Sequence, residues 1–114
     1  MVHDLNTIQQ AVYLQAISKK WNTEALFCIK RAKEELNELD IAVQRLKQLP
    51  SGSNDPNGKM NVAEECIDVL YFIVQAVRDI APEISLNDAF ELKYNANWIN
   101  KKKTVDSKGS VVLR

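Results

Sequence analysis

The apolar residues between positions 24 and 48 are spaced alternately four and three apart, and this spacing constrains the fold more than any other feature of the chain. The set is Ala25, Ile29, Ala32, Leu36, Leu39, Val43 and Leu46. Residues at this spacing share one face of an α-helix, as they do in the seam of a helical bundle. The sequence therefore predicts one long helix over about 24–48 that packs against other helices.

Two further stretches show helical signals on either side of the middle of the chain. A first helix is expected over about 7–20, with Asn6 as its N-cap. A fourth is expected from Ser85, which acts as the N-cap, to about Lys101. The polar residues of the fourth helix include Lys93 and Asn97, which are four positions apart and therefore share a face.

The third helix is predicted over 61–80 and is the most apolar of the four. Asn61 stands at its N-cap position and Glu64 at the position of a capping box. Its apolar residues cover about half of the helix circumference, which is typical of a central helix. The preceding segment, 49–60, is rich in Gly and Pro and is predicted to be a loop, either a plain connector or a lid over a site.

Length and composition agree with a single small all-α domain. The 114 residues are 46% hydrophobic and 26% charged, as in ordinary globular proteins. We expect an antiparallel bundle of about four helices over 1–101, followed by a basic C-terminal tail over 102–114. The 15 basic and 15 acidic residues cancel, and the basic residues of the tail leave the body acidic, which argues against nucleic-acid binding. No apolar run could span a bilayer and no signal peptide is evident, so no membrane partner and a cytoplasmic location are expected.

Two pairs of carboxylates stand one helical turn apart on two of the predicted helices. They are Glu35 with Glu38 and Glu65 with Asp68. Residues three apart point the same way on a helix, and like charges at this spacing destabilise it by about 0.2–0.5 kcal/mol per pair. A cation between facing helices would offset this repulsion, although surface carboxylates at such spacing also occur without any function. The two pairs together predict a cluster of oxygen ligands.

The residue types around these carboxylates limit the chemistry. His3 is the only histidine and lies at the N-terminus, so a zinc centre, a di-iron centre built on histidine and a catalytic triad all lack their ligands or base. Oxygen ligands suit Mg²⁺, with Mn²⁺ as an alternative, and such ions commonly act on phosphate groups. A stripe of Lys93, Asn97 and Lys101 on the fourth helix would then hold phosphate oxygens, the alternative being a solvated helix face.

The order and spacing of these motifs resemble the MazG-like all-α nucleoside triphosphate pyrophosphohydrolases. The resemblance covers about residues 20–101 and rests on Trp21, Leu26, Glu34-Glu35-Leu36-Asn37-Glu38-Leu39, Glu64-Glu65-Cys66-Ile67-Asp68-Val69-Leu70 and Lys93-Tyr94-Asn95-Ala96-Asn97. It implies Mg²⁺-dependent hydrolysis of a (d)NTP to the monophosphate and pyrophosphate, by attack of water at a metal-bound phosphate.

The resemblance also implies roles for individual residues. Glu35, Glu38, Glu65 and Asp68 would be the metal ligands, with Glu34 as a further acidic residue that points about 100° away from Glu35 on the helix. Glu38, or else Glu35, would activate the attacking water. Lys93 and Asn97 would bind phosphates, and Lys101 stands where many members have Arg. Trp21 and Phe72 would face the base or belong to the core.

The apolar surface of the second and third predicted helices exceeds what one thin layer of helices covers, which predicts a homodimer or a dimer-of-dimers tetramer. The base would then lie near a subunit interface, where Gln9, Gln10 and Gln15 of the first helix are candidates to contact it.

Two alternative functions stay open. One is a phosphoribosyl-ATP pyrophosphohydrolase-like enzyme, and the other is a non-catalytic helical interaction module.

Overall fold

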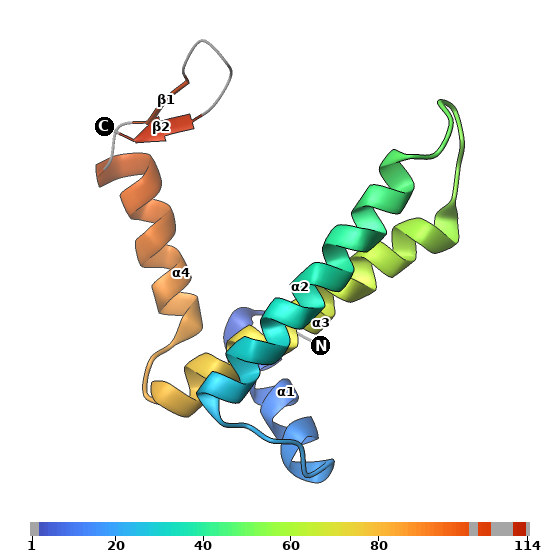
Figure 1. Ribbon diagram of the computed structural model, residues 1–114. Helices are drawn as coiled ribbons and strands as arrows, with labels where there is room; N and C mark the ends of the chain where they lie inside the picture. Colours follow the sequence, from blue (N-terminus) through green and yellow to red (C-terminus); the bar gives the residue numbers. More distant parts are fainter. Residues whose placement is uncertain (1–2, 101–102, 106–110, 114) are drawn as a thin grey trace.

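A computed structural model of the chain describes residues 3–100, 103–105 and 111–113. Its elements in order are α1 Leu5–Ser18, α2 Ala25–Lys47, α3 Pro56–Ile80, α4 Leu86–Asn95, the π-helical turn η1 Ala96–Asn100, and the strands β1 Lys103–Val105 and β2 Val111–Leu113 (Figure 1). The two strands pair antiparallel, with Thr104 opposite Val112. The prediction of an all-α fold with four helices is confirmed, and a small β-ribbon follows the helices.

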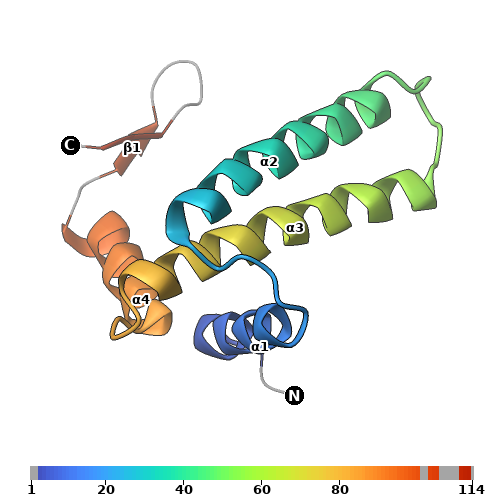
Figure 2. The same ribbon diagram turned by 60° about the horizontal axis from the view of Figure 1, so that its bottom comes forward.

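The helices α2 and α3 form a long antiparallel hairpin that is the best packed part of the molecule (Figures 1 and 2). Small side chains line their contact, because Ala25, Cys28 and Ala76 form a buried cluster against which the ring of Phe72 packs. The hairpin is also tied at one end, where the backbone N–H of Ala25 donates a 2.8 Å hydrogen bond to Asp79 Oδ2. Residues far apart in sequence are thereby held side by side along the hairpin.

Helix α1 is attached to the C-terminal half of α3. Gln9 Nε2 donates a 2.9 Å hydrogen bond to the carbonyl oxygen of Val74, and both residues are buried. Arg78 donates to Gln10 Oε1 at 3.0 Å, and its guanidinium lies 3.7 Å from the centre of the Tyr13 ring. These contacts fix α1 beside one end of the hairpin.

Helix α4 diverges from the α2–α3 hairpin in both views (Figures 1 and 2). Its first turn is linked to α1, since Asn6 Nδ2 donates to Ser85 Oγ at 2.9 Å and the Asn87 N–H donates to Asn6 Oδ1 at 3.2 Å. No residue of α4 is buried. Within one chain the helices therefore form a hairpin with α1 and α4 attached, rather than a closed four-helix bundle.

Several helix ends differ from the sequence-based prediction. Asp4, not Asn6, caps α1 by accepting from the N–H of Thr7, and Asn6 instead holds α4. Helix α3 begins at Pro56 rather than after Asn61, so the loop is shorter than 49–60. Proline is favoured in the first turn of a helix because its missing N–H is not needed there.

The cap of α3 explains this early start. Asp55 Oδ1 accepts a 3.0 Å hydrogen bond from the N–H of Gly58. A Cβ at Gly58 would crowd the Asp55 carboxylate and approach Leu46 Cδ2 to 2.8 Å. A glycine at this position therefore lets Asp55 and Leu46 pack closely, at the point where the two helices are joined.

The wide apolar surface of α3 is only partly covered by the rest of the chain. Val74 and Ala76 are buried, whereas Ile67 is 48% and Ile73 is 40% exposed. The second predicted helix spans α2 to within one residue, and it also leaves apolar side chains such as Leu26 exposed. In the part of the chain that the structure describes, no helix is long and apolar enough to cross a membrane.

Candidate metal centre and adjoining cleft

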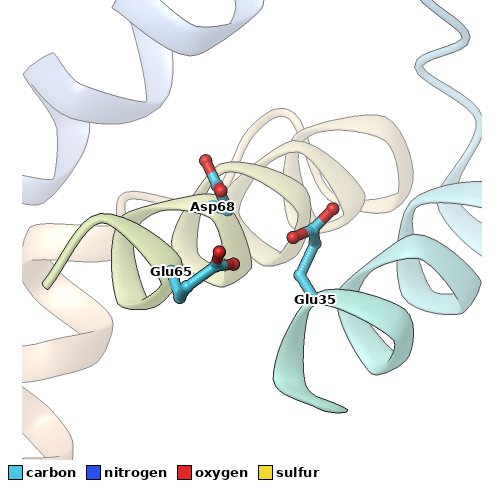
Figure 3. Close-up of side chains that lie close together, drawn as sticks. All are labelled: Glu35, Glu65 and Asp68. Atoms are coloured by element: carbon cyan, nitrogen blue, oxygen red, sulfur yellow. The ribbon is translucent and has the colours of Figure 1, made fainter. Parts of the chain in front are cut away.

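The hairpin brings together three of the four carboxylates of the predicted metal site. One oxygen each of Glu35, Glu65 and Asp68 lies within 4.8 Å of the others. Figure 3 shows Glu35 reaching across from α2 toward Glu65 and Asp68 on α3. Two oxygens bound to a single Mg²⁺ are separated by up to about 4.2 Å, since each bond is about 2.1 Å long. Small side-chain rotations would therefore bring this acidic triad into the geometry of one ion.

Glu65 is the most perturbed member of the acidic triad. Its Oε2 is buried and has no hydrogen-bond partner among the described residues. Burial raises the pKa of the Glu65 carboxyl, and the negative charges of Asp68, Glu35 and Glu38 raise this pKa further. A buried carboxylate oxygen without a donor is unfavourable, because its lost hydration is not replaced. A proton or a cation would relieve this state.

Glu38 lies close to the acidic triad but is exposed on α2. Together with Glu35 and Glu65 it lines a shallow cavity of about 770 Å³. Glu34, on the same helix, is instead paired with Arg31. Both glutamates therefore line this cavity, and they differ in that Glu34 is engaged by a cation.

Arg31 is the cation nearest to these carboxylates. It pairs with Glu34 and also with Glu35, where Nη2 lies 3.3 Å from Oε1. Its guanidinium carbon lies 5.5 Å from the centre of the Phe72 ring, a cation–π distance. The sequence carried a signal for this role, since Arg31 precedes Glu35 by four helical positions.

A second cleft, of about 730 Å³, adjoins the acidic triad between α1, α2 and α3. Glu35 and Asp68 line one part of it, and its other walls are mainly apolar and aromatic. These walls include Trp21, Phe27, Ile67, Tyr71 and Phe72, and the polar residues Gln15, Asn22 and Gln75. The two aromatic residues assigned to a base by resemblance, Trp21 and Phe72, therefore both face this cleft. Phe72 also packs on the core cluster of the hairpin.

Of the three glutamines expected near a base, the structure places only Gln15 on the cleft. Gln9 is buried in its bond to Val74 and Gln10 accepts from Arg78, so both serve the contact of α1 with α3. Gln75 takes the place that they were expected to fill. Its side chain is 4% exposed and its Oε1 has no partner among the described residues.

Two of the predicted phosphate-binding residues, Lys93 and Asn97, are not brought to the acidic triad within one chain. Lys93 is exposed on α4 and Asn97 is half-buried in η1, and neither lines the two cavities. The regular α-helix ends at Asn95 and continues as a π-helical turn to Asn100, which changes the four-residue stripe that the sequence predicted. Lys101 lies outside the described residues.

The loop between α2 and α3 does not take part in either cavity. Residues 48–55 form this connection at the far end of the hairpin (Figures 1 and 2), and neither cavity is lined by them. Met60, which the sequence placed at the end of the loop, is part of α3 and lines the cleft. The loop is thus a connector in this structure, rather than a cover.

The geometry thus offers an oxygen-rich centre beside an aromatic cleft, with one arginine between them. Comparisons with protein-family models, with curated proteins and with solved structures found no match for this chain.

Proposed function

We propose that this protein is a Mg²⁺-dependent nucleoside triphosphate pyrophosphohydrolase of the MazG-like kind, which cleaves a (d)NTP to the monophosphate and pyrophosphate. The observation that carries the proposal is the convergence of Glu35, Glu65 and Asp68 from two helices next to a cleft of nucleotide size. Small-molecule sites are typically clefts of about 300–1,000 Å³ lined by apolar and aromatic groups with a few polar ones.

The donor set fits a hard divalent cation. All candidate ligands are carboxylate oxygens, which Mg²⁺ and Mn²⁺ prefer, and Glu65 Oε2 has no other partner among the described residues. Glu35, Glu65 and Asp68 would hold the ion, and Glu38 lines the same shallow cavity as Glu35 and Glu65. A bound ion of this kind lowers the pKa of water and neutralises charge on a phosphate under attack.

The protein's own residues would then carry out the remaining steps. Glu38, the exposed carboxylate of the group, would accept a proton from the attacking water as the bond between the α- and β-phosphates breaks, leaving pyrophosphate as the other product. Arg31 would exchange its contacts with Glu34 and Glu35 for the charged phosphate oxygens, since guanidinium groups bind both. Trp21 and Phe72 would pack against the base in the aromatic cleft.

Assembly of several copies would complete both the core and the site. The chain exposes 8777 Å², about 2,400 Å² more than a compact protein of its mass. Its radius of gyration is 17.4 Å, against about 13 Å for a compact chain of 100 residues. A typical interface buries about 800 Å² per partner, so the excess suits a dimer or a dimer of dimers. In such an assembly, Lys93 and Asn97 of one copy could reach the acidic triad of another.

The test is a panel of canonical and damaged (d)NTPs, together with phosphoribosyl-ATP, assayed for pyrophosphate release with and without Mg²⁺. We expect release of pyrophosphate and a monophosphate that requires Mg²⁺ and stops on chelation. We also expect Mg²⁺ to stabilise the fold, by about 2.7 kcal/mol at a hundredfold excess over its Kd.

The panel also separates the alternatives. Turnover of phosphoribosyl-ATP alone would assign the related activity on that compound. A protein that neither turns over nucleotides nor gains stability from Mg²⁺ would be a non-catalytic helical interaction module, an outcome for which the exposed apolar residues of α3 and α4 offer a surface.

A further inference from the structure

A second buried acceptor without a partner among the described residues, Gln75 Oε1, lies farther along α3 from the acidic triad, on the same cleft as Asp68. Gln75 lines the aromatic cleft, its side chain is 4% exposed, and its Oε1 has no hydrogen-bond partner among the described residues. Buried amide groups are nearly always hydrogen-bonded, because a lost bond to water must be replaced. An orphan acceptor in the wall of a cleft is therefore a place where a ligand would supply the donor.

The distance between Gln75 and Asp68 along α3 indicates how long a ligand that contacts both must be. The two residues are seven positions apart on α3, which corresponds to two helical turns and about 10.5 Å of rise. Both line the same cleft, with the rings of Tyr71 and Phe72 between them in sequence. A phosphate group held at the acidic triad and a pentose beside it would place a heterocyclic base near Gln75.

We infer that Gln75 is a specificity-determining residue, whose Oε1 accepts a hydrogen bond from an exocyclic amino group of the substrate base. This inference rests on the proposed function and names its substrate class: nucleotides with an amino-bearing base rather than their deaminated counterparts. An amino group projects beyond the edge of the ring and can reach an acceptor recessed in a wall. With the Gln75 amide in the orientation of this structure, the carbonyl that replaces the amino group on deamination would face Oε1 with a second acceptor, which leaves both oxygens unpaired.

Gln9 provides an internal comparison. It is also a buried glutamine near α3, but its Nε2 is bonded to the carbonyl oxygen of Val74. Replacing Gln9 removes an existing bond, whereas replacing Gln75 removes an oxygen that is unpaired in the ligand-free protein. The two substitutions should therefore change stability in opposite directions.

The experiment compares the wild type, Gln75→Met and Gln9→Met in two readouts. The first is kcat/KM for pyrophosphate release from two substrate pairs, dCTP with dUTP and dATP with dITP. The wild type should favour the amino member of at least one pair by about 100-fold or more. Gln75→Met should reduce that preference to within about threefold by slowing the amino substrate, and Gln9→Met should retain it.

The second readout is the melting temperature without nucleotide. Gln75→Met should raise it by about 4 °C or more, since the unpaired buried oxygen is gone, and Gln9→Met should lower it. A purely structural role for Gln75 predicts a lower melting temperature and unchanged base preference, and that result would overturn the inference.

The outcomes also distinguish this inference from the proposed function. Turnover without preference for an amino-bearing base, or a preference that survives Gln75→Met, would reject the role of Gln75 and leave the pyrophosphohydrolase intact. Failure of the wild type to turn over any nucleotide would reject both.

Discussion

The α2–α3 hairpin and helix α4 were equally easy to recognise as helical from sequence, yet they differ greatly in how far they are buried in the fold. The hairpin buries Cys28, Val74 and Ala76 and holds three carboxylates in register across the two helices. Helix α4 buries none of its residues, and its Phe90 and Tyr94 form an aromatic row with Trp98 of η1, with successive ring centres 6.0 Å and 6.3 Å apart. The contact between the two hairpin helices is therefore formed within one chain, whereas α4 leaves its aromatic and charged side chains exposed.

The largest expected effect concerns the hairpin. Glu65→Gln should lower the rate of pyrophosphate release by more than about 100-fold, since the loss of a ligand should cost at least as much as the loss of its supporting contacts. The matched control is Asp40→Asn, an exposed carboxylate of α2 that lines neither cavity and should reduce the rate by less than about threefold. Equal rates in the two variants would show that the acidic triad does not hold the catalytic ion.

The next effect tests whether α4 of one copy serves the hairpin of another. Each of the variants Lys93→Ala and Asp68→Asn should be nearly inactive on its own. For Lys93→Ala we expect the rate of pyrophosphate release to fall by about 10–100-fold or more. If sites combine residues from two copies, mixing the variants and allowing subunit exchange should restore part of the activity, because some mixed assemblies contain one intact site. Absence of recovery in a verified mixed assembly would assign each site to a single chain.

Core packing gives a smaller effect that contrasts the two regions directly. Val74→Ala should lower the free energy of unfolding by about 2 kcal/mol, since this valine is 4% exposed. Phe90→Ala should cost less than about 0.5 kcal/mol in the dissociated chain, where Phe90 is 60% exposed. In an assembly that covers α4, the cost of Phe90→Ala should grow with protein concentration in chemical denaturation, whereas that of Val74→Ala should stay constant.

The smallest effect is a dependence of stability on pH. Because the pKa of Glu65 is raised above its ordinary value of 4.5, the folded protein retains a proton there that the unfolded chain has already released. The free energy of unfolding should therefore fall as the pH rises from 4.5 through the raised pKa, and Glu65→Gln should remove this slope.

Melting curves in a chelator measure this dependence, with Glu64→Gln as the control that keeps the slope. In excess Mg²⁺ the trend should reverse, since ionised carboxylates bind the ion more tightly as the pH rises. A wild-type slope equal to that of Glu65→Gln would mean that the pKa of Glu65 is not raised in solution.

The elements of the fold were largely predictable from sequence because helix signals are local. The spacing of Ala25, Ile29 and Ala32 and the capping position of Ser85 placed α2 and the start of α4 to within a residue. The start of α3 was predicted five residues late, because Asn61 and Glu64 mimic a capping box while Asp55 and Pro56 form the actual cap. Two adequate caps in one segment cannot be ranked by pattern alone.

The candidate site was predictable only in its charged part. Carboxylates on two helices show their common face by their spacing, so the residues of the acidic triad were identified before their positions were known. The separation of Lys93 from the acidic triad depends on the direction in which α4 leaves the hairpin, which no local pattern encodes. The unpaired oxygen of Gln75 depends on which neighbours surround it, and a glutamine in a helix carries no sign of that.

Arg31 contacts both halves of the site, because it lines the cleft and the shallow cavity and also lies over Phe72. A ligand in the cleft that draws the guanidinium away from Glu35 would leave the negative charge of Glu35 uncompensated in the shallow cavity. Binding in one of the two cavities would then alter binding in the other through Arg31. For the proposed ion and nucleotide, thermodynamic reciprocity requires that the factor by which the ion changes nucleotide affinity equals the factor by which the nucleotide changes ion affinity.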